Sequence, residues 1–548
     1  MLNPRFCNHL YISSFLLVMH ILLNPDEIIL GIDLGTTNSC AYYIDSSHEE
    51  PLPVTYDSGP QNILPSCVQY TEDAVIVGEP AKRLIGRRGR FVVKNSKRMI
   101  GMRMDDKEVS AFKNNCGCVI SEVEEKPVFV VSNEGKRKTP CDVGSDILKK
   151  IKERAELITE KHIKEIMITF PAHFDNNQRT ATLLAAMKAG FDRRCIHMMN
   201  EPTAAAYCYG LDRDNTQQNI LVYDLGGGTF DVSILRIDHG SYSVLAYAGN
   251  NTLGGSDFDQ AIAADFEKCY KETFNESCFD DDITDEMKER LRRRIIQEAE
   301  NVKILLKNLD SVGVNICFER VQYDDDDDDD NDFQYTLEKM NRVLDPFITK
   351  TIETVTRALC IANLKREDIS QIVLIGGSSR LKIVRQKLLE FFGRDIISAE
   401  MHPDESVAKG ACLALANEFK ASERITYSLG QLVSYNGLKV QCIIPKKSII
   451  PTEHQLVTAT SEDYCTRIKC AVCQGNSETR NELEDAANCV SLEPYYITDI
   501  TLAPKGSIHI LTRYFLDASG LVHVTEKEME TNRVLVDDMI VMWKDPVV

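Results

Sequence analysis

Two short segments of the chain place an aspartate at the end of an apolar run, directly before a glycine-rich turn. Residues 28–32 run into Asp33 and one such turn, and residues 220–223 run into Asp224 and another. Glycine beside a strand end lets backbone N–H groups approach phosphate oxygens, since a side chain there would collide with the ligand. Threonine hydroxyls in the turns add donors, and strand-end aspartates suit a hydrated Mg²⁺ ion.

The two turns together predict one site for a phosphate chain and its magnesium ion. A single Asp-x-Gly-Thr turn is most often a plain structural turn, so this prediction depends on the repetition. No Gly-x-x-x-x-Gly-Lys segment is present, which excludes a P-loop enzyme. The predicted phosphate-binding residues are Gly35, Thr36, Thr37, Gly226, Gly227, Gly228 and Thr229, and the predicted magnesium-binding residues are Asp33 and Asp224.

The elements around these turns predict two related α/β lobes. One turn lies near the start of each half of residues 25–417, and helical stretches at 144–160 and 177–190 flank an apolar strand at 165–170. Such a repeat in alternating α/β sequence favours two lobes that face each other across a cleft, each contributing one phosphate-binding hairpin.

Beyond about Phe419 the pattern changes to short alternating strands, and no long amphipathic helix follows them. Turns rich in Pro, Gly, Asn and Asp separate these runs, which is typical of an all-β module of about 120 residues. Cys470 and Cys473 lie in one run and should point to opposite faces of a strand, which argues against a zinc site. The predicted strands are residues 438–444, 455–460, 468–472, 508–515 and 521–525.

Length and charge exclude several classes of protein. A chain of 548 residues is too long for one compact core. With 83 acidic and 63 basic residues and a net charge of −20, the surface should repel nucleic-acid phosphates, so no nucleic-acid partner is expected. The 18 cysteines follow no paired spacing and are interpreted as mostly buried thiols. The aspartate run at 324–330 is interpreted as a solvated loop rather than a cation site.

An apolar run at residues 10–23 raises the question of location. It is shorter than the roughly 20 residues that a membrane-spanning helix needs, so no stable membrane insertion is expected. Its length suits the core of a signal peptide, but the residues after it form a poor cleavage site. We therefore expect a cytoplasmic protein; the alternative is the lumen of the endoplasmic reticulum, with residues 1–24 as a signal-like extension.

Six longer motifs resemble those of the 70-kDa heat-shock chaperone family, in the same order. They are GIDLGTTNSC at 31–40, NEPTAAA at 200–206, DLGGGTFD at 224–231, LGGSDFD at 253–259, LIGGSSR at 374–380 and PDESVA at 403–408. The resemblance extends over roughly residues 27 to 540. It implies an actin-like, ribonuclease-H-like two-lobed ATPase domain at 25–417, a linker at 418–426, and an all-β peptide-binding sandwich at 427–545 without a helical lid.

The same resemblance implies roles for individual residues. Lys97 would reach the γ-phosphate, neutralise charge on the transferred phosphoryl group and help to orient the attacking water. The implied hydrolytic set is Lys97, Glu201, Asp33, Asp224 and Thr229. In addition to the turn residues already named, the implied ATP-binding residues are Asn38, Gly255, Glu300, Lys303, Gly376, Gly377, Ser378 and Asp404.

The sequence also departs from the family pattern. In the helix that recognises adenosine, Ile304 and Lys307 stand where the family has Arg and Ser, so nucleotide affinity should be weaker. Pro171 and Arg179 match the positions that couple the two domains, but the linker lacks the family's apolar run, which should weaken the coupling. Ile468 matches the floor of the family's peptide groove; the alternative is that it is a plain core residue.

The resemblance thus implies an ATP-hydrolysing chaperone that binds unfolded or nascent polypeptides. The implied cofactors are ATP or ADP with Mg²⁺, and K⁺ is a further candidate; the implied partners are a J-domain co-chaperone and a nucleotide-exchange factor. A weakly hydrolysing co-chaperone or scaffold is the main alternative. A sugar kinase ranks last, because kinases of that fold lack an appended β groove.

Overall fold

The structure is a computed structural model in which most of the chain is described. The described residues are 23–48, 50–56, 62–85, 91–112, 118–210, 217–238, 241–250, 253–275, 277–279, 284–316, 333–398, 402–417, 423–434 and 437–547. None of the helices within these ranges has both the length and the apolar character to cross a bilayer. The predicted aspartate loop at 324–330, the signal-like residues 1–22 and linker residues 418–422 lie outside the described residues.

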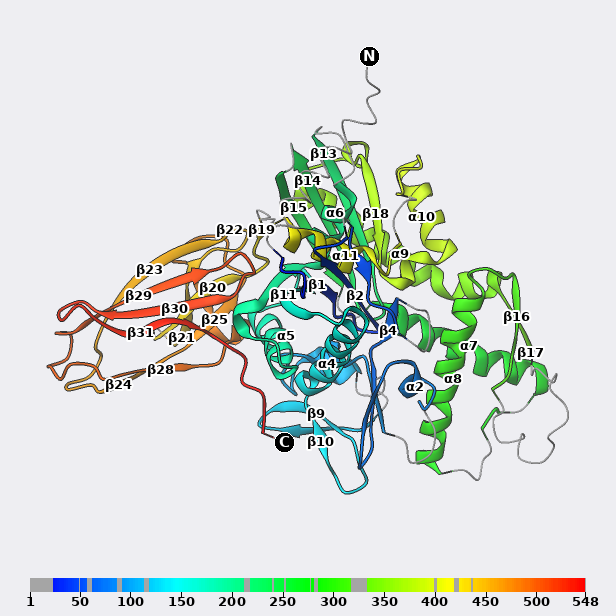
Figure 1. The fold of residues 1–548 in the computed structure, drawn as a ribbon, viewed down its shortest axis with the longest axis horizontal. Coiled ribbons are helices and arrows are strands. Elements are labelled where there is room, and N and C mark those ends of the chain that lie inside the picture. The colour runs from blue at the N-terminus through cyan, green and yellow to red at the C-terminus, as the bar shows by residue number, and fades with distance from the viewer. Residues whose placement is uncertain are drawn as a thin grey trace, which may run out of the picture.

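The first lobe is built on a mixed sheet with the strand order β12-β11-β1-β2-β3, in which β4 also pairs with β2 (Figure 1). β1 (Glu27–Asp33) runs antiparallel to β2 (Asn38–Asp45) and parallel to β11 (His162–Phe170). β1 is buried on both faces, so its sequence is a continuous apolar run rather than an alternating one. The other strands of this sheet are β3 (Leu52–Pro53), β4 (Ile63–Pro65) and β12 (Ile196–Asn200).

Two helices cover the outer face of this sheet, and both begin at reciprocal side-chain caps. α4 (Pro140–Thr159) starts after Thr139, and α5 (Asn176–Lys188) starts after Asp175. Such caps satisfy the free N–H groups of a first helical turn and fix where the helix begins. The smaller elements of the lobe are β5 (Cys67–Tyr70), β6 (Val75–Val77), α2 (Glu79–Lys82), β7 (Val92–Lys94), η1 (Ser96–Met99), α3 (Lys107–Phe112), β8 (Ile120–Val123), β9 (Lys126–Val130), β10 (Arg137–Lys138) and η2 (Arg193–Cys195).

The second lobe repeats the strand arrangement of the first. β13 (Gln218–Leu225) runs antiparallel to β14 (Phe230–Asp238) and parallel to β18 (Gln371–Ile375), as β1 does with β2 and β11. The predicted repeat of two α/β lobes is therefore confirmed. The remaining elements are β15 (Ser241–Asn250), α7 (Gly255–Phe274), α8 (Asp285–Leu305), β16 (Ser311–Val314), β17 (Phe333–Thr336), α9 (Leu337–Ala362), η4 (Arg366–Asp368), η5 (Gly377–Arg380) and α10 (Lys382–Phe392).

Two alanine-rich helices, α6 (Glu201–Gly210) and α11 (Ser406–Ala416), lie between the two sheets. Their backbones approach closely, since a Cβ on Gly410 would lie 1.9 Å from the carbonyl oxygen of Ala204. α11 packs on β1 in the same way, because a Cβ on Gly31 would lie 2.2 Å from the backbone nitrogen of Cys412. Small side chains thus let the two lobes share one thin apolar layer.

The residues after 423 form two antiparallel sheets that enclose one apolar core. One sheet has the order β26-β21-β20-β25-β27 and the other the order β23-β29-β30-β31, so the predicted β-sandwich is confirmed. Its elements are β19 (Glu423–Arg424), β20 (Ser428–Ser434), β21 (Leu438–Ile444), β22 (Ile449–Ile450), β23 (Thr452–Ala459), β24 (Arg467–Cys470), β25 (Val472–Gly475), β26 (Leu483–Asp485), η6 (Ala486–Asn488), β27 (Val490–Ser491), β28 (Tyr495–Thr498), β29 (His509–Leu516), β30 (Val522–Glu528) and β31 (Arg533–Ile540).

One predicted strand of the sandwich is wrong. The run 468–472 is divided at Ala471 between β24, which pairs with β28, and β25, which pairs with β20 and β27. The alternating pattern continues across the break because Cys470 and Val472 are both buried. A period of two residues therefore shows which side chains face the core, but it does not show when a strand changes partners.

The close packing of α11 on β1 yields a test of the fold. Gly31→Ala should lower the free energy of unfolding by about 1–3 kcal/mol, because the added methyl group collides with the α11 backbone. Gly144→Ala is the matched control: it lies in α4, its Cβ would keep an ordinary 3.4 Å distance from Ala185 Cβ, and alanine favours helix. Urea unfolding of both variants measures the difference, and equal stability would contradict the packing described.

Candidate functional site

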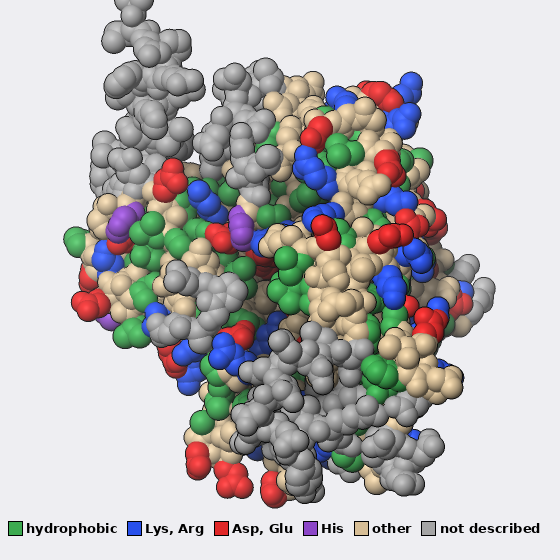
Figure 2. Space-filling model, turned by 90° about the vertical axis from the view of Figure 1, so that its right-hand side faces the viewer, with side chains coloured by type: hydrophobic (Ala, Val, Ile, Leu, Met, Phe, Trp, Pro, Cys, Tyr) green, Lys and Arg blue, Asp and Glu red, His purple; other side chains and the backbone are tan. Residues whose placement is uncertain are grey.

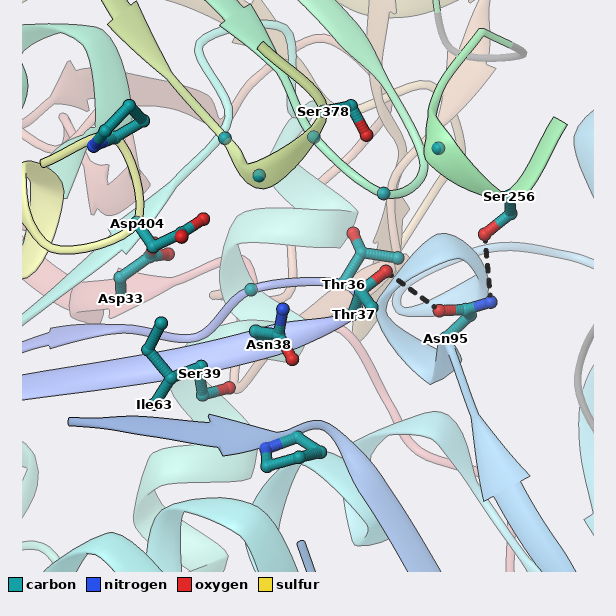
Figure 3. A pocket seen from close by; sticks show the side chains of 18 of the residues that line it. Asp33, Thr36, Thr37, Asn38, Ser39, Ile63, Asn95, Ser256, Ser378 and Asp404 are labelled. Atoms are coloured by element: carbon teal, nitrogen blue, oxygen red, sulfur yellow. Dashed lines mark hydrogen bonds between the residues drawn. The ribbon is translucent and has the colours of Figure 1, made fainter. Parts of the chain in front are cut away.

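A cavity of about 600 Å³ opens between the lobes where the two glycine-rich hairpins face each other (Figure 3). With one exception, every residue predicted to bind ATP or magnesium, or to hydrolyse ATP, lines this cavity. The lining residues from the prediction are Asp33, Gly35, Thr36, Thr37, Asn38, Lys97, Glu201, Asp224, Gly226, Gly227, Thr229, Gly255, Glu300, Lys303, Gly376, Gly377, Ser378 and Asp404.

The exception is Gly228, which does not lie on the cavity wall. A Cβ at this position would lie 2.4 Å from Arg98 Nε and 2.9 Å from Thr36 Cγ2. Gly254 packs on its other side, with a Cβ position 2.7 Å from the Gly228 backbone. Protein atoms thus leave no room for a side chain at Gly228, and the prediction that its backbone contacts phosphate stays a prediction.

The two hairpin turns contact each other across the cleft. A Cβ on Gly227 would lie 1.8 Å from Thr37 Oγ1, so only glycine fits there. Thr37 in turn donates to Asn95 Oδ1 at 3.3 Å, and Asn95 Nδ2 donates to Ser256 Oγ at 3.2 Å (Figure 3). The sequence prediction missed Asn95 and Ser256 as cavity residues, although Asn95 lies two positions before the predicted Lys97 and Ser256 directly follows the predicted Gly255.

Lys97 and Glu201 form a buried ion pair in the cavity wall, with Nζ 2.7 Å from Oε1. The lysine side chain is only 7% exposed. Lys97 belongs to η1, which begins after Asn95, and Glu201 is the first residue of α6, where the helix dipole favours a negative charge. The structure thus brings together the two predicted hydrolytic residues that are most distant from the hairpins in the sequence.

The two strand-end aspartates lie in an environment with excess negative charge. Burial, together with the charge of Glu201, raises the pKa of Asp33 to about 7, even though the charge of Lys97 opposes the shift. Burial also raises the pKa of Asp224 well above its ordinary value, with Glu201, Asp231 and Asp33 acting in the same direction. Several carboxylates thus share one nearby lysine, and additional positive charge would stabilise their ionised forms.

This donor set fits a hydrated magnesium ion. Within the described ranges, no three side chains of His, Cys, Asp or Glu converge as a direct metal-ligand group. Mg²⁺ usually keeps several of its waters and is held through one or two carboxylates together with substrate phosphates. Asp33 from one lobe and Asp224 from the other supply carboxylates of that kind in the cavity wall.

Charged pairs form the far end of the cavity, where α8 provides the residues predicted to contact the nucleoside. Glu300 pairs with Lys82 Nζ at 2.7 Å, and Lys303 pairs with Asp259 at 2.6 Å. Although burial alone would raise it, Lys82, Lys303 and Lys94 lower the pKa of Glu300 to about 2. Lys82 and Asp259 were missed by the sequence prediction, because their partners lie far away in the chain.

Ile304 and Lys307, the residues that depart from the family pattern, also line this end. The side chain of Ile304 is 53% exposed and has no hydrogen-bonding group to offer a base. On the opposite wall Asp404 is already engaged in an ion pair with Arg380. Ile304 can therefore offer a base only packing, and the weaker nucleotide affinity stays a prediction.

One face of the molecule carries mixed charge (Figure 2). Figure 2 views the molecule from the α7 and α8 side, and acidic and basic side chains alternate over the parts of this face that are not grey. No extended basic surface is visible there.

The predicted coupling residues lie between the cavity and the β-sandwich. Pro171 lines the cavity itself. Arg179, in α5, is 1% exposed and donates to Phe174 O at 2.8 Å and to Ser519 O of the sandwich at 2.7 Å. Its guanidinium also lies 4.6 Å from the ring centroid of Phe170. One arginine thus contacts the loop that follows β11 and the β29–β30 turn at once.

The described part of the predicted linker docks through a buried acid rather than through an apolar run. Glu423, in β19, is 4% exposed, and its carboxylate accepts from Thr203 Oγ1 at 2.8 Å and from the Asn200 amide. Burial raises the pKa of Glu423 to about 6, even though its hydrogen bond to Thr203 and the charge of Arg179 oppose this. Polar contacts therefore occur where the family's apolar docking run was predicted to be missing.

The fold and the cavity together define an actin-like, two-lobed α/β protein with phosphate-binding hairpins, joined to a β-sandwich. Comparison with known proteins agrees. Residues 29–538 match the family model described as Hsp70 protein. The chain is also 34% identical to the chaperone protein DnaK of Stenotrophomonas maltophilia (strain R551-3) over 518 residues, which is 92% of this chain and 77% of that protein. The chain therefore belongs to the Hsp70 family.

The buried Glu423 yields a prediction about pH. Its pKa of about 6 lies above the ordinary value of 4.5, so the native state binds more protons than the unfolded chain between these values. The stability that Glu423 contributes is therefore complete below pH 4.5 and is lost as the pH rises through 6. The free energy of unfolding should fall by about 2 kcal/mol over this range. Glu423→Gln should flatten the stability profile over this window, whatever its absolute stability.

Urea unfolding between pH 4.5 and 7 measures these slopes. Glu462→Gln is the matched control, because Glu462 is exposed on the sandwich surface and should leave the slope of the parent chain unchanged. Parallel slopes in the parent and Glu423→Gln chains would show that Glu423 is not buried in solution.

Proposed function

We propose that this protein is an ATP-driven chaperone, which binds Mg·ATP between its lobes, hydrolyses it and binds extended, unfolded polypeptide in its β-sandwich. Membership of the Hsp70 family supports a chaperone function. The observation that carries the hydrolytic part is the buried Lys97–Glu201 pair, located in the same cavity wall as both hairpins and both strand-end aspartates.

The residues of the cavity divide the work of phosphoryl transfer. Backbone N–H groups of the glycine turns and the hydroxyls of Thr36, Thr37 and Thr229 hold the phosphates. Lys97 balances charge that develops on the transferred group, and Glu201 keeps the lysine oriented and can position the attacking water. Asp33 and Asp224 would hold a hydrated magnesium ion, which would supply charge neutralisation for the phosphates. We also propose K⁺ as a further cofactor.

The β-sandwich supplies the proposed polypeptide site near Ile468. This side chain is half-buried on β24, which pairs with β28 in a separate two-stranded sheet. Exposed apolar residues occur in the adjoining segments: Tyr464 is 63% exposed and donates its backbone N–H to Ala503 O, next to Leu502, which is 62% exposed. A strand edge beside exposed apolar side chains can bind an extended chain through backbone hydrogen bonds with little dependence on its sequence.

The proposed partners are unfolded or nascent chains, a J-domain co-chaperone and a nucleotide-exchange factor, and the proposed location is the cytoplasm. These proposals are supported by family membership and by the relative named chaperone protein DnaK. The domain bounds 25–417, 418–426 and 427–545 also remain proposals.

Replacing the cavity lysine tests hydrolysis. Lys97→Ala should lower the single-turnover rate of ATP hydrolysis about 10²- to 10³-fold, because one preorganised cation is lost from the transition state. Lys150→Ala, which removes an exposed lysine from α4, should leave the rate unchanged. Calorimetry with Mg·ATP should show that both variants still bind nucleotide. Equal near-zero rates in the parent and Lys97→Ala chains, with ATP bound, would instead favour the weakly hydrolysing scaffold.

Replacing the groove residue tests peptide binding. Ile468→Asp should weaken the binding of a fluorescent apolar heptapeptide roughly tenfold or more, because an apolar contact is exchanged for a buried charge. Val457→Asp is the control, since Val457 is 48% exposed on β23. Fluorescence anisotropy in ADP measures both affinities. Unchanged affinity of the Ile468 variant would place the peptide elsewhere and support the interpretation of Ile468 as a core residue.

A further inference from the structure

The residues that follow β31 leave the sandwich and cross onto the first lobe (Figure 1). In this view the end of the chain lies beside β9 and β10. Trp543, the one tryptophan of the chain, is 5% exposed and packs in the apolar core of the first lobe, as does Leu521 of the sandwich. We call residues 541–545 the strap. The strap packs on a lobe whose residues lie some 350 positions earlier in the chain.

Side chains of α5 bind the backbone of the strap. Asn176 Nδ2 donates to Val541 O at 2.8 Å, and Thr180 Oγ1 accepts from Trp543 N at 2.9 Å. Asn176 Oδ1 also accepts from the backbone N–H of Val522 at 3.2 Å. Asn176 and Thr180 are both fully buried, so polar side chains are placed in the core of the interface with the strap and the sandwich as their partners.

Charged side chains of the first lobe contact the carboxyl-terminal half of the strap. Lys126 Nζ lies 4.2 Å from the centroid of the Trp543 ring and also donates to Lys544 O. The Asp545 carboxylate accepts from Thr139 Oγ1 at 2.7 Å and pairs with Lys188. The site thus offers a cation above an aromatic ring, and a hydroxyl and an ammonium for a carboxylate two residues later.

We propose that the first lobe carries a second peptide site, separate from the nucleotide cavity and from the groove near Ile468. Its ligand is an extended segment with a bulky aromatic residue followed two positions later by a carboxylate. Residues 541–545 of the same chain fill this site, and their binding holds the β-sandwich against the first lobe.

The wall of this site is in contact with the loop that carries Lys97. The backbone of α5 packs against Gly101, where a Cβ would lie 2.6 Å from Gln178 Cα and from Gln178 N. A shift of the 97–101 segment would therefore press on the first turn of α5, which also bears Asn176. Packed backbone has no free space in which to absorb such a shift. Binding at the strap site is therefore connected mechanically to the nucleotide cavity through this contact.

Intrinsic fluorescence of the full chain tests the strap, because Trp543 is its one tryptophan. Asp545→Asn should raise the ratio of open to docked molecules roughly tenfold or more, since it removes charge-assisted hydrogen bonds at the end of the strap. Emission should then shift to longer wavelength and acrylamide should quench it more strongly. Asp537→Asn, which changes an exposed acid on the adjacent β31, is the matched control and should leave emission unchanged.

A second variant and a free peptide separate a binding site from simple packing. Trp543→Ala should undock the sandwich, seen in solution scattering as a larger radius of gyration with unchanged far-ultraviolet circular dichroism. A labelled peptide with the sequence of residues 539–547 should then bind this variant, and much less the parent chain, whose site is filled. The same peptide with asparagine at position 545 should bind more weakly.

Two results would overturn the inference. One is unchanged fluorescence in Asp545→Asn together with unchanged scattering in Trp543→Ala. The other is a folded, undocked Trp543→Ala chain that does not bind the peptide. Neither readout involves ATP hydrolysis or the Ile468 groove, so the outcome does not depend on the function proposed above.

Discussion

The arrangement of buried charge in the cavity between the lobes is the constraint on which the rest of the structure depends. Asp33, Asp224 and Glu201 come from different elements, and Lys97 is the cation that opposes all three. Burial makes this arrangement costly unless further positive charge balances it. The magnesium ion of the proposed Mg·ATP would supply such charge, whereas the two lobes themselves are joined by the apolar layer of α6 and α11.

The interface between the first lobe and the sandwich follows a similar rule on a smaller scale. Arg179, Asn176 and Thr180 are buried on α5, yet each has a hydrogen-bond partner in the sandwich or in the segment after it. Glu423 does the same from the linker side. Such an interface is specific, because undocking would break these hydrogen bonds and the buried polar groups would have to be hydrated instead. The contact between the first lobe and the sandwich therefore depends on charge, whereas a contact made by an apolar linker would not.

The sequence predicted the cavity better than it predicted the sandwich. Asp33 ends β1 and Asp224 is the next-to-last residue of β13, each after an apolar run, so their position at a sheet edge follows from local pattern alone. The run 468–472 kept its alternation while changing partners at Ala471, which no local pattern reveals. Gly228 belongs to the same turn as Gly226 and Gly227, and only the tertiary structure shows that Arg98 and Gly254 pack against it.

The sequence by itself determined the two hairpins, the family motifs and the change to an all-β module, because each is encoded by residue types within a few positions of one another. Only the tertiary structure decided which distant charges meet. The pairs Lys82–Glu300 and Lys303–Asp259, the contact of Arg179 with Ser519, and the burial of Trp543 beside Lys126 join segments widely separated along the chain. Such contacts depend on how finished lobes pack together, and that packing is set by the sum of many weak interactions rather than by any one motif.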